Sequence, residues 1–146
     1  MTNNNFYNSF FLKHPIILSQ EHLMPEKITI LPETRVIAFI PSSPSQEEMN
    51  LLHAIMNSCK ITENQFQVIP LPYAWKHCVS ENIKEVILFG VTEKELQLSI
   101  ELPHNWPINF DTKSWIKTNT LGQLIQSKEL KNDLWHKALK PQFFKS

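Results

Sequence analysis

The stretch from Arg35 to Glu48 has the residue order of a ligand-binding loop. Val36 to Ile40 is a short apolar run rich in β-branched side chains, which predicts a strand buried on both faces. The segment Pro41-Ser42-Ser43-Pro44 breaks that run, and Ser45 followed by Glu48 is a capping-box pattern that begins a helix. A helix N-terminus directly after a buried strand offers free N–H groups to an anion, so the loop stands where a phosphate could bind.

The composition of this loop argues against a working site. A phosphate-binding loop uses glycine to bring its backbone close to the ligand, and the segment contains none. A serine at the start of a helix more often caps that helix than binds a ligand. We therefore interpret Pro41, Ser42, Ser43 and Pro44 as the remnant of a ligand site.

Other reactive side chains lack partners at useful spacing. His77 and Cys78 could form a nucleophile pair, but adjacent residues in a helix or strand point apart. Cys59 and Cys78 are the two cysteines of the chain, too few for a zinc or iron–sulfur site made of cysteines. The six histidines are scattered, without an H-x-x-x-H pair. The sequence predicts neither a metal nor a cofactor.

The composition is that of one globular domain in a reducing compartment. A chain of 146 residues with 42% hydrophobic residues has enough length for a normal core. Fourteen basic and fourteen acidic residues give zero net charge, which removes the general argument for a DNA-coating protein. The small number of cysteines favours the cytoplasm, and we expect neither a membrane span nor a secretory signal.

Residues 1–25 differ from the rest of the chain, and we treat them as an arm that precedes a single α/β domain of residues 26–146. Their aromatic residues recur one helical turn apart. Such a cluster either packs on its own domain or docks in a groove of a partner, and the sequence leaves both readings open. The residues expected to bind a partner are Phe6, Tyr7, Phe10, Phe11, Leu12, Ile16 and Ile17.

Strands and helices alternate in the remaining chain, which predicts an α/β fold. We expect a three-layer α/β/α architecture around a central, mainly parallel four-stranded sheet. The predicted strands are 36–40, 66–69, 85–89 and 114–117, with an additional edge strand over 28–31. The predicted helices are 46–59, 73–82, a brief one over 92–98, and a last one that begins near 127 and stops at Pro141, whereas 102–111 reads as an irregular loop.

Apolar residues at helical spacing mark the buried face of the two long helices. In the first helix they are Met49, Leu52, Ile55, Met56 and Cys59; in the last they are Leu130, Leu134 and Ala138. Trp135 lies beside the second stripe, and we expect it to be a core residue whose truncation to alanine costs about 3–5 kcal/mol.

The order of these elements resembles the uracil-DNA glycosylase superfamily. Phe39-Ile40-Pro41-Ser42-Ser43-Pro44-Ser45 stands where that family has its first motif, roughly F-V-G-E-A-P-G. The segment from Leu51 to Val68 is similar to the part after that motif, and Thr118 to Leu139 is similar to the second motif and its helix. The resemblance implies a uracil-DNA glycosylase-like fold.

The departures from the family pattern fall on its chemistry. The acidic residue of the first motif falls at Ser42, between Pro41 and Ser45 where glycines are expected. The histidine, proline and serine of the second motif fall at Thr120, Leu121 and Gly122. Base excision needs a group that positions water and a histidine that stabilises the departing base. The resemblance therefore implies the fold without the catalytic residues, and so not an enzyme.

A second resemblance, to the psi subunit family of the bacterial DNA polymerase III clamp-loader assembly, points the same way. It rests on Ile28-x-Ile30-Leu31-Pro32-x-x-x-Val36-Ile37-x-Phe39, on Arg35 before the strand, on Leu134-Trp135 and on the tail Phe143-Phe144. In that family an apolar N-terminal extension binds the clamp loader, and Phe6 to Leu18 occupies the equivalent place. The implied partners are clamp-loader subunits, with a chi-like subunit that contacts single-strand-binding protein.

Two other functions stay open at the level of sequence. A divergent uracil or mismatch glycosylase would need replacement residues from the long loop, such as His104, Asn105 or Asp111, although these read more plainly as solvated. A nucleic-acid-binding module, with direct contact to DNA, would use basic and aromatic side chains that are otherwise surface and core residues. They are Lys113, Lys117, Lys128, Lys131 and Lys137, with Trp75, Trp106, Trp115 and Trp135.

Overall fold

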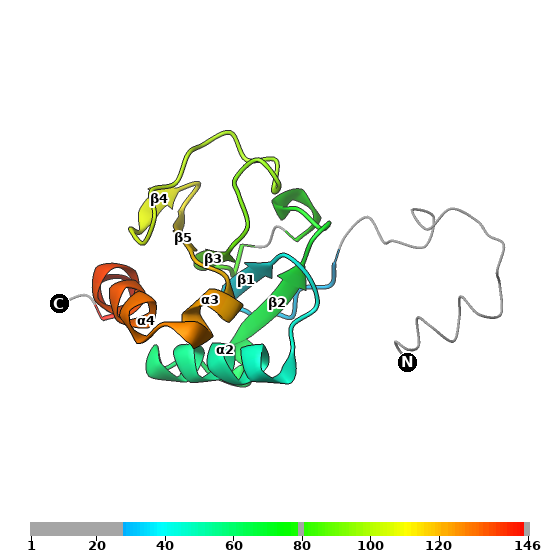
Figure 1. Cartoon of the computed structure of the whole chain (residues 1–146). Helices are drawn as coiled ribbons and strands as arrows, with labels where there is room; N and C mark the ends of the chain where they lie inside the picture. Colours follow the sequence, from blue (N-terminus) through cyan, green and yellow to red (C-terminus); the bar gives the residue numbers. More distant parts are fainter. Residues whose placement is uncertain (1–27, 79–80, 145–146) are drawn as a thin grey trace, which may run out of the picture.

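The structure is a computed structural model that describes residues 28–78 and 81–144. These residues form a five-stranded sheet in the order β2-β1-β3-β5-β4, with the helices α2, α3 and α4 gathered on one side of it (Figure 1). The first four strands of that order are parallel, and β4 is antiparallel to β5. The predicted α/β class with a mainly parallel sheet is therefore confirmed, whereas the number of strands is five rather than four.

The strands agree with the predicted segments, with one addition. Their bounds are β1 Val36–Ile40, β2 Phe66–Pro70, β3 Glu85–Phe89, β4 Ile108–Phe110 and β5 Lys113–Thr118. The strand missed in the sequence is β4, which turns into β5 through Asp111 and Thr112 at φ of 56° and 64°. A two-residue hairpin turn needs positive φ at both positions and usually shows Asn-Gly or Asp-Gly. Asp-Thr carries only half of that signal, so the prediction of an irregular loop was wrong here.

The predicted edge strand over 28–31 is also wrong. This segment is a strap held by the side chain of Gln67 on β2 rather than by a backbone ladder. The Gln67 amide Nε2 donates to the carbonyl of Thr29, and its Oε1 accepts from the N–H of Leu31 and the hydroxyl of Thr34. Ile28 and Ile30 pack on the core, so alternating apolar residues here mark a packed strap.

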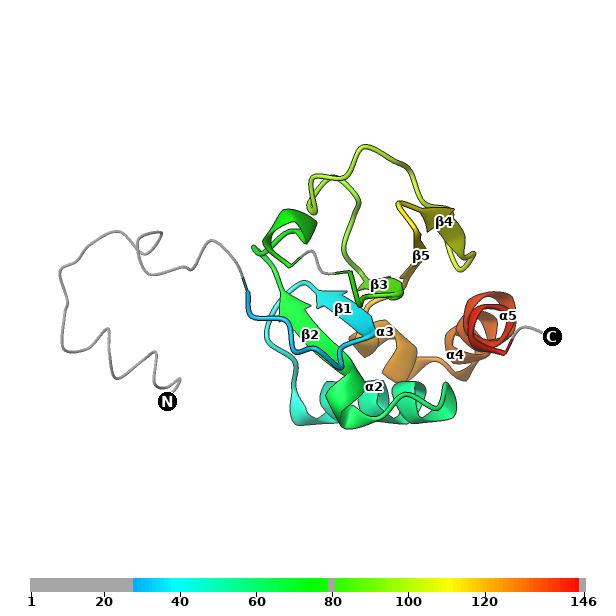
Figure 2. The ribbon, with the colours of Figure 1, turned by 180° about the vertical axis from the view of Figure 1, so that it is seen from behind.

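The chain adds β2 on one side of β1 and then returns to add β3 on the other side. The two connections therefore run along opposite faces of the sheet. α2 (Gln46–Ser58) connects β1 to β2 on one face, with Leu52 and Met56 buried. The next connection crosses the other face, where the 3-10 helix η3 (Trp75–His77) and the segment 91–102 pack (Figure 2). The arrangement is compatible with the three-layer class, since short helical and irregular segments form the second covering layer.

The last part of the chain is more helical than the sequence predicts. α3 (Leu121–Gln126) precedes α4 (Lys128–Leu134), which begins after Ser127 as predicted. A π-helical segment, η4 (Trp135–Leu139), then leads into α5 (Lys140–Phe143), so the prediction that Pro141 stops the helix is wrong. Pro141 stands in the first turn of α5, directly after the π-helical segment, and this change in helical winding accommodates a residue without an N–H.

Two shorter helix predictions also change. The predicted helix over 73–82 is reduced to η3, with Trp75 buried as expected. Thr92 and Glu95 make the capping hydrogen bonds that the sequence predicts, but the segment that follows is a series of turns rather than a helix.

One ion pair ties the last helix to the sheet. The guanidinium of Arg35 donates to both carboxylate oxygens of Glu85, at 2.8 and 2.9 Å, and only 4% of the Glu85 side chain is exposed. Arg35 also lies over the ring of Phe143 at 5.5 Å, and Gln142 on α5 donates to Glu85 at 3.4 Å. The hydrogen bond with Glu85 raises the pKa of Arg35. Arg35 therefore has a structural role at the start of β1.

Within the described part of the chain, no helix combines the length and the apolar character that crossing a membrane requires.

Candidate functional site

A cavity of about 240 Å³ lies where β1 and β5 end. An open α/β sheet binds its ligands outside the carboxyl ends of its strands, near the point where the winding direction reverses, which here is between β1 and β3. The cavity lies at this carboxyl edge, although no residue directly after β3 lines it. The cavity is lined by Ile40, Pro41, Ser42, Pro44, Glu48, Thr120 and Leu121. The fold thus brings together the two segments that resemble the glycosylase motifs, although they are far apart in the sequence.

Most of the predicted motif positions contribute to this cavity, and two do not. Ser43 is exposed but is not among the lining residues. Gly122 is also not among the lining residues, and a Cβ there would stand 3.4 Å from Oε2 of Glu48. Leu121 is only 3% exposed, so this lining residue also belongs to the core.

Glu48 is the charged residue of the lining, and sequence analysis assigned it only to a helix cap. The capping box is present: the Ser45 hydroxyl accepts from the N–H of Glu48 at 3.1 Å, and Oε1 of Glu48 accepts from the N–H of Ser45 at 2.8 Å. The cap fixes one carboxylate oxygen and leaves Oε2 without a hydrogen bond among the described residues. The capping role of Glu48 was identifiable from the sequence pattern. Its place in the cavity lining was not, because the lining combines segments that are far apart in the sequence.

Thr120 also serves as a helix cap. Its hydroxyl accepts from the N–H of Gln123 at 3.0 Å, and its N–H donates to Oε1 of Gln123 at 3.0 Å. Thr120-x-x-Gln123 is a capping-box pattern, so this signal could have predicted α3 from the sequence. At position 120 the structure therefore holds a hydroxyl committed to the backbone of α3.

The two glycines of the chain both lie against Thr120. Gly90 follows β3 with φ of 72°, and a Cβ there would stand 2.2 Å from the Thr120 Cγ2. Its N–H donates to the carbonyl of Thr118 at 3.0 Å, which joins the ends of β3 and β5. Glycine is therefore required at this point by both the backbone conformation and the close approach.

The residues suggested as replacement catalysts are dispersed along the loop. His104 is exposed, and its Nε2 lies 3.2 Å from Oδ1 of Asn119, next to Thr120 but outside the cavity lining. Asp111 is exposed in the β4–β5 turn. Asn105 is only 4% exposed, which corrects its reading as a solvated residue. Its N–H donates to the carbonyl of Lys117 at 2.8 Å, so it anchors the loop to β5.

The lysines proposed for nucleic-acid binding do not form one surface. Lys113 is 7% exposed, with its Nζ over the ring of Trp75. Lys117 pairs with Glu93 at 3.0 Å, and Lys137 pairs with Asp133 at 3.7 Å. Lys128 and Lys131 are exposed on α4. The geometry therefore offers little for a basic groove.

Glu93 sits in a polar environment beside an open hollow of about 500 Å³. Burial raises the pKa of Glu93, but hydrogen bonds from the N–H groups of Leu102 and Glu93, together with Lys117, outweigh that effect and lower it. The pair with Lys117 is therefore charged at neutral pH and holds the segment after β3 against β5.

The tryptophans differ widely in exposure. Trp75 and Trp115 are buried in the core and Trp135 is half-buried, whereas Trp106 is 60% exposed in the loop before β4. The expectation that Trp135 is a full core residue is corrected, because it packs at the edge of the core cluster and stays half-buried, with Phe144 as its ring neighbour.

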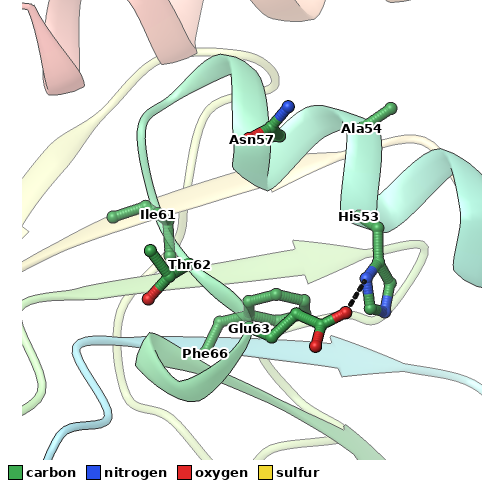
Figure 3. Close-up of a pocket in the computed structure, with 7 residues that line it drawn as sticks. All are labelled: His53, Ala54, Asn57, Ile61, Thr62, Glu63 and Phe66. Carbon is green, nitrogen blue, oxygen red and sulfur yellow. Dashed lines mark ion pairs between the residues drawn. The ribbon is translucent and has the colours of Figure 1, made fainter.

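A second hollow, of about 290 Å³, lies between α2 and the 3-10 helix η2 (Glu63–Gln65). His53 and Glu63 point toward one another across it, with Nδ1 and Oε1 3.4 Å apart (Figure 3). The His53 ring also meets the edge of Phe66 at 5.4 Å. Glu63 is 83% exposed, so this pair is a solvated contact, and sequence analysis assigned nothing to it.

Cys59 and Cys78 are both free and buried. Burial raises the pKa of each thiol to about 12. In the described ranges no group of three histidine, cysteine or acidic residues is placed to hold a metal. The predicted partner-binding residues Phe6 to Ile17 lie outside the residues that the structure describes.

We expect both thiols to resist iodoacetamide in the folded protein at about pH 8, because only the thiolate reacts. Mass spectrometry would show modification after unfolding in urea and little before it. The raised pKa of both thiols also predicts lower stability at alkaline pH. A thiol in the unfolded chain ionises at about pH 8.5, so the free energy of unfolding falls as the pH rises from there toward 12. Equal labelling rates before and after unfolding would contradict the burial of these thiols.

The comparisons with known proteins return no relative: no protein-family model, no curated protein and no solved structure matches this chain. The chemistry of the cavity therefore rests on its own side chains. They are one carboxylate, two hydroxyls and apolar groups, without an imidazole among them.

Proposed function

We propose that this protein is a non-catalytic replication adaptor that resembles the psi subunit of the DNA polymerase III clamp-loader assembly. It would have a uracil-DNA glycosylase-like fold and dock on clamp-loader subunits through residues 1–25. A chi-like subunit, and through it single-strand-binding protein, are the further partners that the resemblance suggests. The proposed location is the cytoplasm, where free cysteines stay reduced.

The observation that supports this proposal is that two of the polar side chains that line the cavity serve as helix caps. Base excision needs a group that positions water and a group that stabilises the leaving base. In the cavity the hydroxyl of Thr120 caps α3, and one oxygen of Glu48 caps α2. Side chains that support helices are poorly suited to chemistry, so a binding role fits this site better than catalysis.

The decisive experiment measures the affinity of the full chain for purified clamp-loader subunits of its own host. We expect Phe10→Ala with Phe11→Ala to weaken binding at least about tenfold, since buried aromatic anchors dominate such interfaces. Trp106→Ala removes an exposed aromatic residue from the folded domain and is the matched control, with affinity unchanged.

Two outcomes would count against the adaptor. Absence of binding by the unaltered chain would remove the proposed partner. Loss of the folded domain in the double variant, seen as a lost cooperative melting transition, would mean that these residues belong to the core rather than to a docking arm.

A divergent glycosylase is the second candidate, because Glu48 lies in the cavity and His104 is held next to it through Asn119. Uracil release from single- and double-stranded DNA tests it directly. Activity in the full chain that disappears in Glu48→Gln and in His104→Ala would replace the adaptor with an enzyme.

A further inference from the structure

We propose that the cavity at the ends of β1 and β5 binds the side chain of a lysine or arginine from a protein partner, with Glu48 as its counter-ion. The ligand chemistry is argued from the cavity, whereas the identity of the ligand as part of a protein partner rests on the proposed function.

The lining suits a long side chain with a charged end. Pro41, Pro44, Ile40 and Leu121 supply apolar walls, and Glu48 supplies the single charge. Lysine and arginine bury their methylene stems along apolar surface while the charged group needs polar partners. An anionic or purely apolar ligand would leave the Glu48 carboxylate without a matching group.

Two helix ends and two carboxylates determine the charge around the cavity. α2 and α3 both begin here, and each helix N-terminus contributes about half a positive charge at most. Glu47 and Glu48 contribute two full negative charges in the first turn of α2, and α3 has no acidic residue in its first turn. None of the residues that line the cavity is basic. Glu48, the carboxylate inside the lining, about balances the two helix ends, and Glu47 stands outside the lining. The preference for a cation therefore comes from the free oxygen of Glu48 and not from the net charge around the cavity.

The oxygen Oε2 of Glu48 is held in place but accepts no hydrogen bond from the described residues. The N–H of Ser45 holds Oε1 at 2.8 Å and fixes the carboxylate, while Oε2 has no hydrogen-bond partner in the described ranges. Gly122 leaves one side of this oxygen uncovered, because a Cβ at that position would come into contact with Oε2 at 3.4 Å. A fixed carboxylate oxygen without a partner, on a side chain that lines a cavity, is what a charge-assisted hydrogen bond from a cation requires.

The test uses short peptides as probes of the full-length protein. The peptides are Ac-Gly-Lys-Gly-NH₂ and Ac-Gly-Arg-Gly-NH₂, with matched peptides that carry norleucine or glutamate in the central position. Amide chemical shifts from ¹⁵N NMR report the site of binding. We expect saturable shifts at Ser42, Glu48 and Leu121 with either cationic peptide and none with the two controls.

The variants separate this site from general electrostatic attraction. Glu48→Gln keeps the capping box, which accepts glutamine as well as glutamate, and removes the charge. We expect it to weaken cationic peptide binding about tenfold, as loss of a hydrogen bond between charged groups predicts. Glu47→Gln removes the same charge one residue away, outside the cavity lining, and should change the affinity less than about twofold.

A second variant tests the space rather than the charge. Gly122→Ala places a methyl group beside Oε2 on a helical residue, where alanine is favourable for the helix. Binding should fall while the melting temperature stays the same or rises. Equal losses in Glu48→Gln and Glu47→Gln, equal shifts with the norleucine peptide, or an absence of saturable shifts would each overturn the proposal.

The peptide result and the clamp-loader result are independent. Site-specific peptide binding supports the cavity even when the clamp loader fails to bind, and its absence overturns the cavity even when the clamp loader binds. If the adaptor is correct as well, Glu48→Gln should also weaken the clamp-loader complex, whereas Glu47→Gln should leave it unchanged.

Discussion

Replacement of Trp115 by alanine should lower the free energy of unfolding by about 4 kcal/mol. Trp115 is 0% exposed and fills the core on the face of the sheet opposite α2. Its ring makes an edge contact with Trp75, with centroids 5.0 Å apart, and a tilted contact with Phe110 at 6.1 Å. Its Nε1 donates to the carbonyl of Phe110 at 2.8 Å. The substitution would leave a large cavity and remove one hydrogen bond to the carbonyl of Phe110.

Urea denaturation followed by far-ultraviolet circular dichroism measures this loss without relying on tryptophan fluorescence. A natural domain is stable by about 5–15 kcal/mol, so the variant should remain mostly folded at low temperature but unfold at much lower urea concentration. A change below about 1 kcal/mol would mean that Trp115 is not packed as the structure has it.

The other tryptophans provide matched controls for the same measurement. Trp106 is 60% exposed, and its truncation should change stability by less than about 0.5 kcal/mol. Trp135 is half-buried, so we expect about 1–2 kcal/mol rather than the full core cost that the sequence suggests. The order Trp115, Trp135, Trp106 is the prediction, and equal effects would contradict it.

The strand–loop–helix at the start of the domain was readable because local signals suffice there. A continuous apolar run from Val36 to Ile40 has little alternative to a buried strand, and Ser45 with Glu48 determines where the helix begins. The structure confirms both. These features depend on residues close together in the sequence, which is what pattern reading detects.

Features that depend on distant contacts could not be found in this way. The meeting of Ser42 with Thr120 in one cavity follows from the pairing order of the sheet, which no local pattern contains. The exposure of Trp106 compared with Trp115 likewise depends on distant contacts, since Trp75 of η3 packs against the Trp115 ring. Pro141 was misread because proline usually ends a helix, whereas here it stands where a π-helical segment passes into a new first turn.

Glycine at position 90 should prove essential to the carboxyl edge of the sheet, and Gly90→Ala should cost about 3 kcal/mol in stability. A residue with a Cβ loses roughly 1–2 kcal/mol at the left-handed φ of 72°. The added Cβ would also stand 2.2 Å from Cγ2 of Thr120, and overpacking of this kind costs about 1–3 kcal/mol.

Thr120→Ser separates these two causes, because it removes Cγ2 and retains the hydroxyl that caps α3. Alone it should change stability by less than about 1 kcal/mol. Combined with Gly90→Ala it should recover about 1 kcal/mol of the loss, since the cost of the backbone conformation and the contact with Cβ of Thr120 at 3.1 Å remain. A double-mutant cycle from urea denaturation gives this coupling. Strict additivity would mean that Gly90 is required only for its backbone conformation. The side chain of Thr120 would then shift away from the added Cβ without measurable cost.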